Sequence, residues 1–124
     1  MAVAMKNREG EKILIQTVKD LVENANPRMT FCLAAATSFV FIGTAEEFKR
    51  DMDLLDRHFC SALFQDEYIP LMNRKITGYH KRDVPGETAH MFYIEGKDRG
   101  IFWLRCEYED FIKKCRKRSS HKDQ

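Results

Sequence analysis

The sequence predicts an α+β fold, in which a mostly antiparallel sheet with a C-terminal three-stranded meander is packed by two or three helices. Two independent observations carry this prediction. Thr44 and Glu47 have the spacing of a capping box ahead of an amphipathic stretch, which indicates a helix. Residues 75–105 place apolar and aromatic runs between glycine- and proline-containing turn sequences, a pattern typical of a meander.

Length and composition indicate one ordinary globular domain over residues 1–124. A chain of 124 residues, 44% hydrophobic and 32% charged, can bury a core without disulfides. We find no run long enough to span a membrane and no signal-peptide pattern, so we expect a cytoplasmic protein without membrane contact. The four cysteines form no C-x-x-C pair, so we expect reduced thiols.

The first third of the chain is expected to form a helix and two short strands. Residues 11–24 repeat apolar side chains at helical intervals, and Pro27 lies just beyond their end. Residues 29–43 end in aromatic and β-branched side chains, which favour strands. We place a break between the two strands at 36–38.

The middle of the chain begins with the capping box, which predicts a helix from Ala45 to about Leu55. We expect residues 57–64 to form a strand, because the charged pair at 56–57 interrupts the apolar helical period. The alternative is that the helix continues through them.

Residues 75–95 are expected to form a hairpin about a turn at 85–86. We prefer the register that sets His80 opposite His90, because it pairs apolar with apolar side chains near the base of the hairpin. A two-residue Pro-Gly turn would shift the register by one and set His80 opposite Met91 instead.

The C-terminal segment supplies the third strand of the meander, Ile101 to Arg105, and a final helix from about Glu107. We expect residues 116–124 to be a flexible basic tail. The inward face of the helix is predicted to carry Tyr108, Phe111, Ile112 and Cys115.

Two pairs of potential metal ligands suggest a zinc site. If residues 57–64 form a strand, His58 and Cys60 lie on one face, since residues two apart in a strand share a face. His80 opposite His90 would add two imidazoles, and four such nitrogen and sulfur ligands suit zinc. We therefore predict a zinc site of His58, Cys60, His80 and His90. The alternative interpretation is that the histidines are polar neighbours within a folded sheet.

The end of the chain carries a concentrated positive charge. Six cations and no acid lie between Lys113 and Lys122, so that this segment carries +6 and the rest of the chain −4. Such a segment can contact phosphates or an acidic protein surface. The predicted partner-binding residues are Lys113, Lys114, Arg116, Lys117 and Arg118.

Catalytic motifs are not evident in the sequence. The GKDRG segment lacks the G-K-[ST] of a phosphate-binding loop, and ETAH is not the H-E-x-x-H of zinc peptidases. A thiol-dependent enzyme that uses Cys60 is the third hypothesis, after a protein-binding module and a zinc-stabilised nucleic-acid-binding module. We expect no enzyme activity.

Two segments resemble small accessory proteins of phages and prophages. FIGTAEEFKRDMDLLDRHF is similar to their strand, Gly-Thr cap and Glu-Glu helix unit, here Gly43, Thr44, Glu46 and Glu47. ITGYHKR and MFYIEGKDRGIFW are similar to their glycine-containing meander. The resemblance implies a role in binding a host protein, and it makes the anti-CRISPR inhibitors of type II RNA-guided nucleases a natural candidate. Many such inhibitors imitate DNA with an acidic surface, whereas this chain carries a net charge of +2.

Overall fold

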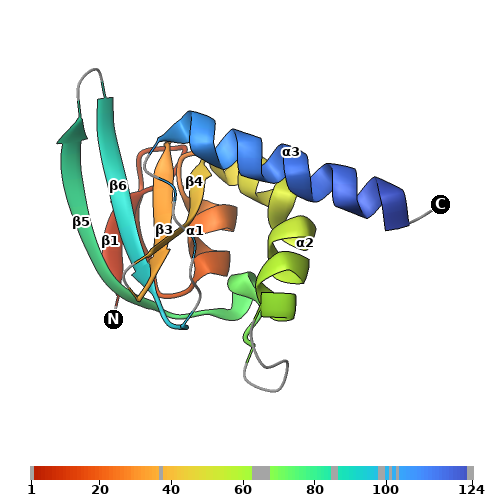
Figure 1. The fold of residues 1–124 in the computed structure, drawn as a ribbon. Helices are drawn as coiled ribbons and strands as arrows, with labels where there is room; N and C mark the ends of the chain where they lie inside the picture. Colours follow the sequence, from red (N-terminus) through yellow and green to blue (C-terminus); the bar gives the residue numbers. More distant parts are fainter. Residues whose placement is uncertain are drawn as a thin grey trace.

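The fold is α+β, as expected. The computed structural model describes residues 2–36, 38–62, 68–84, 87–97, 100, 102 and 104–122. These residues form a four-stranded mixed sheet, a two-stranded antiparallel sheet and three α-helices. Figure 1 shows the larger sheet beside the helix α2 (Ala45–Ala62), with the helix α3 (Arg105–Lys122) crossing α2 and reaching beyond it. Neither α2 nor α3, nor any shorter helix described, is apolar enough over sufficient length to cross a membrane.

The chain begins with a hairpin of β1 (Val3–Lys6) and β2 (Lys12–Ile15), followed by the short helix α1 (Val18–Asn24). The helix expected over 11–24 is therefore confirmed only over Val18–Asn24, and Lys12–Ile15 form a strand instead. A second capping box sets the actual start: the Thr17 hydroxyl accepts from the Asp20 N–H at 3.2 Å, and the Asp20 carboxylate accepts from the Thr17 N–H at 3.2 Å.

The two strands expected between residues 29 and 43 are confirmed as β3 (Phe31–Ala35) and β4 (Ser38–Gly43). They pair antiparallel, and the break between them begins at Ala36, whose φ is +56°. All five residues of β3 are buried. This strand is therefore interior to the sheet rather than at its edge.

The larger sheet is mixed, so the expectation of a mostly antiparallel sheet is wrong. Its strand order is β4-β3-β6-β5, where β5 is Ile76–Val84 and β6 is Glu87–Ile94. β5 and β6 pair antiparallel, but β6 pairs parallel with β3. The buried strand β3 occupies the edge of β6 that a third meander strand would need.

The three-stranded meander is accordingly not confirmed. Of the strand expected at 101–105, Phe102 and Leu104 lie outside any strand and Arg105 is the first residue of α3. Ile101 and Trp103 lie outside the described residues.

The hairpin of β5 and β6 combines the two registers considered above. Ile76 pairs with Ile94, as expected, but the register shifts by one between Ile76 and Gly78. His80 consequently lies opposite Met91 and not opposite His90. A bulge next to Gly78 thus keeps the apolar pair at the base while the rest of the ladder follows the shifted register.

The shifted register continues to the end of the hairpin, where Val84 pairs with Glu87. Two residues separate these partners in the sequence, which is the spacing of a two-residue connection. The Pro-Gly turn predicted at 85–86 lies outside the described residues.

The helix α2 runs over Ala45–Ala62, longer than expected. Its capping box is confirmed: the Glu47 N–H donates to the Thr44 hydroxyl at 3.3 Å and the Thr44 N–H to the Glu47 carboxylate at 3.2 Å. The strand expected at 57–64 is wrong as far as residue 62, because Phe59 continues the buried helical stripe past the charged pair. Residues 63–67 lie outside the described residues.

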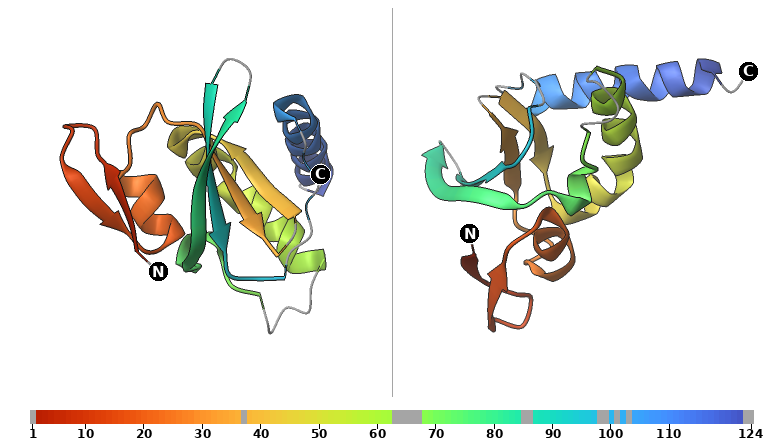
Figure 2. Two further views of the ribbon diagram at one scale, coloured as in Figure 1. Left: turned by 90° about the vertical axis from the view of Figure 1, so that its left-hand side faces the viewer. Right: turned by 90° about the horizontal axis from the view of Figure 1, so that it is seen from below.

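A short 3-10 turn (η2, Leu71–Asn73) precedes β5, and α3 (Arg105–Lys122) ends the described chain. The inward face of α3 is confirmed: Tyr108, Ile112 and Cys115 are buried and Phe111 packs against the core. Residues 116–122, which we expected in a flexible tail, continue the helix. The right view of Figure 2 shows its last turns extending beyond α2.

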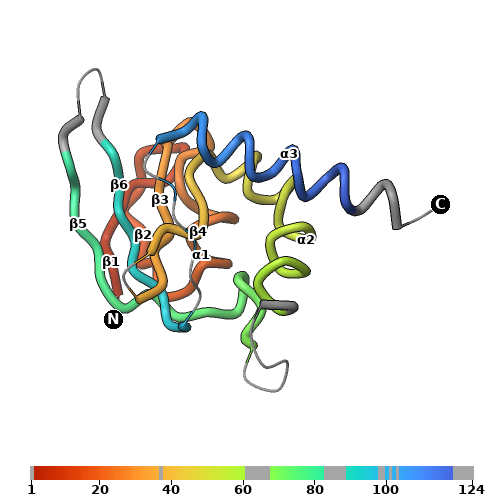
Figure 3. The backbone as a smooth tube through the Cα atoms, in the orientation of Figure 1, coloured from red at the N-terminus to blue at the C-terminus, as the bar shows by residue number. Residues whose placement is uncertain are grey.

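An aromatic cluster joins the sheet to both long helices. The ring centroid of Phe41 on β4 lies 5.0 Å from that of Phe48 on α2 and 5.2 Å from that of Tyr108 on α3, and both contacts are edge to face. Phe31 on β3 lies 5.3 Å from Phe41. The backbone trace in Figure 3 shows α2 and α3 on the β4 side of the molecule.

Candidate functional site

The first half of the predicted zinc site does not form as expected. His58 and Cys60 lie on α2, where residues two apart point about 200° from each other. The His58 ring packs edge-on against Phe111 of α3, with centroids 4.7 Å apart. Burial, and then the charge of Arg118, lower the pKa of His58. This histidine is part of the contact between the two helices.

The second half fails because of the register. His80 pairs with Met91 and Lys81 with His90, so the two histidines occupy neighbouring ladder positions and point to opposite faces of the sheet. His80 is exposed, with its ring 5.6 Å from Tyr93. On the other face, His90 is held by Tyr79, whose hydroxyl lies 2.8 Å from Nδ1.

Both geometric premises of the zinc hypothesis are therefore wrong. Within the described part of the chain, no three His, Cys, Asp or Glu side chains converge in a way that suits a metal ion. Zinc binding stays a prediction without support from the arrangement of these residues.

The predicted partner-binding cations do share one element. Lys113, Lys114, Arg116, Lys117 and Arg118 all lie on α3 and are all exposed. Ile112 and Cys115 are buried, so the side chains on the other faces of this part of the helix point toward solvent. The helix thus presents them from a regular support rather than from an irregular tail.

A buried carboxylate fixes α3 on α2. Asp51 is fully buried and accepts hydrogen bonds from Arg116 Nη2 at 2.5 Å, Arg50 Nε at 3.0 Å and the Tyr108 hydroxyl at 3.3 Å. Burial opposes the ionisation of Asp51, but the hydrogen bonds from Arg50 and Arg116 outweigh it and hold its pKa below the ordinary value. Burial, and then the charge of Asp51, raise the pKa of Tyr108, so this hydroxyl stays protonated as the donor.

A second set of ion pairs fixes the first turn of α3. Arg105 pairs with Glu47 of the α2 capping box and, at 3.2 Å, with Glu109. Its Nη1 also donates to the Ile42 carbonyl of β4 at 3.2 Å. Arg105 therefore links α2, β4 and α3 at one point.

Asp51 was not among the site residues predicted from the sequence. A signal for it was present: Asp51 lies three residues after Phe48 and four before Leu55, on the apolar stripe of α2. An acid on a buried stripe requires a cationic partner. The partner, Arg116, is 65 positions away in the sequence.

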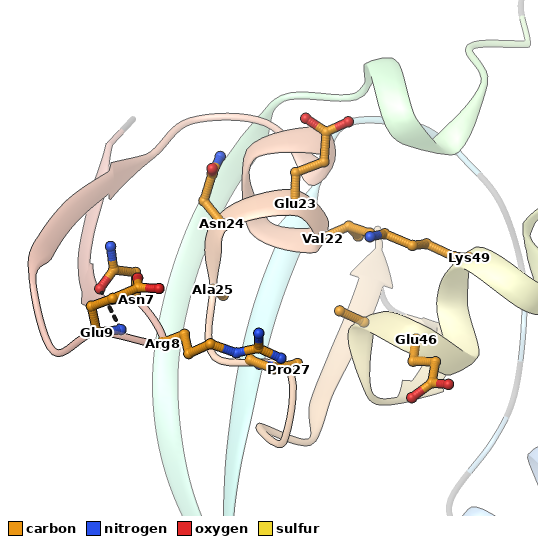
Figure 4. Close-up of a pocket in the computed structure, with 11 residues that line it drawn as sticks. Asn7, Arg8, Glu9, Val22, Glu23, Asn24, Ala25, Pro27, Glu46 and Lys49 are labelled. Atoms are coloured by element: carbon orange, nitrogen blue, oxygen red, sulfur yellow. Dashed lines mark hydrogen bonds between the residues drawn. The ribbon is translucent and has the colours of Figure 1, made fainter.

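A hollow lies where the β1–β2 turn, the end of α1 and the start of α2 meet (Figure 4). Its charges are mixed: Arg8 and Lys49 face a lining that also contains Glu9, Glu23 and Glu46. In Figure 4, Glu23 and Glu46 point away from each other and away from Lys49. No single ligand charge would be favoured there.

No protein family, curated protein or solved structure matches this chain.

Proposed function

We propose that the chain is a non-enzymatic binding protein whose α3 helix engages an acidic surface on a protein partner. The contact surface, here called the basic surface of α3, consists of Lys113, Lys114, Lys117 and Arg118. One observation carries the proposal: Arg116 pairs with Asp51, whereas none of these four side chains forms an ion pair with another described residue.

The arrangement of these four charges is unfavourable within the isolated chain. Lys113 and Lys117, and likewise Lys114 and Arg118, are four apart on the helix, where like charges destabilise it by about 0.2–0.5 kcal/mol per pair. The helix dipole favours cations near the C-terminal end and offsets part of this cost. An acidic partner would remove the remaining repulsion.

The charge distribution along α3 favours a protein over a nucleic acid. Glu107, Glu109 and Asp110 are exposed on its first turns, so the helix is acidic at one end and basic at the other. A uniformly negative phosphate backbone would be repelled by these acids. A protein surface with the opposite distribution of charge would complement both ends.

The resemblance to phage accessory proteins narrows the proposal to a host protein in the bacterial cytoplasm, with a type II RNA-guided nuclease as the first target to test. The net charge argues against imitation of DNA at the arginines that read the PAM. Contact with an acidic face elsewhere on the nuclease fits the basic surface of α3 better. Inhibition of target-DNA cleavage by the purified protein tests this narrower proposal.

The general proposal is tested by capture from a bacterial lysate treated with nuclease. The variant Lys114→Gln/Lys117→Gln removes two charges from the basic surface, and Lys19→Gln/Lys49→Gln removes two exposed charges elsewhere. Loss of two exposed ion pairs, each worth up to about 1 kcal/mol, should weaken partner binding by up to about thirtyfold. The control should bind like the parent protein. Two results would contradict the proposal: binding that occurs in untreated lysate but not after nuclease treatment, or equal loss of binding in both variants.

A further inference from the structure

A second positively charged region lies on the opposite side of the molecule from α3. A hollow of about 760 Å³ opens between the β1–β2 hairpin, the loop after α1, and the sheet face of β5 and β6. The left view of Figure 2 shows this hairpin on the side of the molecule away from α3. The volume lies within the range of small-molecule binding sites, roughly 300–1,000 Å³.

The charges around this hollow have one sign. Lys6, Lys12, Arg28 and Lys81 line it, and no carboxylate is among the described lining residues. Lys6 and Lys12 are paired directly opposite each other in the hairpin, an arrangement that destabilises a ladder when the charges are alike. None of the four cations forms an ion pair with a described residue. An anion in the hollow would neutralise them together.

The floor of the hollow is apolar and aromatic. Tyr79 and His90 line it with their rings nearly parallel, at 17° and with centroids 6.1 Å apart. The hydrogen bond between the Tyr79 hydroxyl and His90 Nδ1, 2.8 Å long, holds both rings in place. Met5 and Met29 add polarisable thioethers beside them. A flat ring can therefore pack against this floor.

We propose that this hollow binds a nucleotide, with the phosphates held by the cations and the base packed on the floor formed by Tyr79 and His90. Phosphate needs clustered cations, and a base needs an apolar or aromatic surface, and the hollow combines the two. A free nucleotide and the end of a single-stranded oligonucleotide share this chemistry. The site is separate from the basic surface of α3.

The test uses three probes on the full chain: ATP, a fluorescein-labelled decamer of deoxythymidine, and tripolyphosphate, which has the charge without a base. Lys81→Gln should weaken binding of ATP or the decamer about tenfold, and Tyr79→Leu should weaken it several-fold while leaving tripolyphosphate unaffected. Lys6→Gln is a second exposed substitution in case Lys81→Gln alters folding, which thermal melting would reveal. Lys49→Gln is the matched control and should bind like the parent protein.

The outcomes separate the sources of the ligand. Binding of ATP and the decamer, or of either alone, with loss on Lys81→Gln supports the site and identifies which source it takes. Tripolyphosphate binding as tightly as ATP would overturn the role of the aromatic floor. The proposal is also overturned by the absence of binding, or by decamer binding that depends on Lys114 and Lys117 and not on Lys81. The protein-binding role of α3 is tested separately, by the capture experiment.

Discussion

Replacing Asp51 by asparagine should loosen the attachment of α3 to α2 with little change in shape. The substitution removes the charge that Arg50 and Arg116 bind, while it keeps an oxygen able to accept from Tyr108. The carboxylate is fully buried, whereas the Arg50 and Arg116 side chains are 57% and 44% exposed. Water can therefore solvate both guanidinium groups again after the charge is lost.

The expected loss in the free energy of unfolding follows from this difference in exposure. Removal of one partner from a fully buried ion pair costs about 3–5 kcal/mol. Half-exposed partners recover part of their hydration, so we expect a loss of about 2 kcal/mol in the free energy of unfolding at pH 7. For a domain of this size, that corresponds to a fall in melting temperature of about 6–10 °C.

The assay is urea unfolding of the parent protein and Asp51→Asn at pH 7 and at pH 3. Because the pKa of Asp51 lies below its ordinary value of 3.8, its contribution is complete above that value and is lost as the pH falls through the folded-state pKa. The two proteins should therefore converge in acid. Asp53→Asn, an exposed acid on the same helix, is the control and should change stability by under about 0.5 kcal/mol. A loss no larger than the control's, or a difference independent of pH, would refute the reasoning.

Three further predictions test the helix assignments and the contact between α2 and α3. Thr44→Ala removes the hydroxyl that caps α2 and should cost about 1 kcal/mol in urea unfolding; an unchanged midpoint would mean that the cap contributes nothing. Phe59→Ala deletes a ring that is 2% exposed and should cost about 3–5 kcal/mol, whereas a cost under 1 kcal/mol would contradict its place in the core. The pKa of His58 is lowered, so its folded form disfavours the proton and stability should fall as the pH drops through the unfolded value of about 6.5. His58→Gln should reduce this fall between pH 7.5 and 5.5, and the exposed His80→Gln should not; melting curves at the two pH values decide.

Features set by local chemistry were predictable from the sequence. The capping box at Thr44 and Glu47, the break after Ala35 and the buried stripe of α3 each depend on residues within a few positions of one another. The same rule applied to Thr17 and Asp20 would have placed the start of α1 correctly. Local patterns cannot decide between a helix and a strand where the same residues are compatible with both. At 57–64, either structure would bury Phe59.

The features that were missed depend on contacts between distant segments. The parallel pairing of β3 with β6 joins Phe31 to His90, and no local pattern specifies such a pair. A single bulge beside Gly78 decides whether His80 and His90 share a face, which removes the geometric basis of the zinc prediction. The anchoring of Arg116 by Asp51 likewise appears only once α2 and α3 are packed together.

The central claim, that the basic surface of α3 contacts an acidic protein, is tested most directly by photo-crosslinking. A photoreactive amino acid in place of Lys113 lies within the surface, and one in place of Lys19 lies on α1 as the control; both positions are exposed. In nuclease-treated host lysate, we predict a discrete protein crosslink from position 113 that is absent from position 19 and is reduced by Lys114→Gln/Lys117→Gln. Equal crosslinks from both positions, or none from position 113, would contradict the claim.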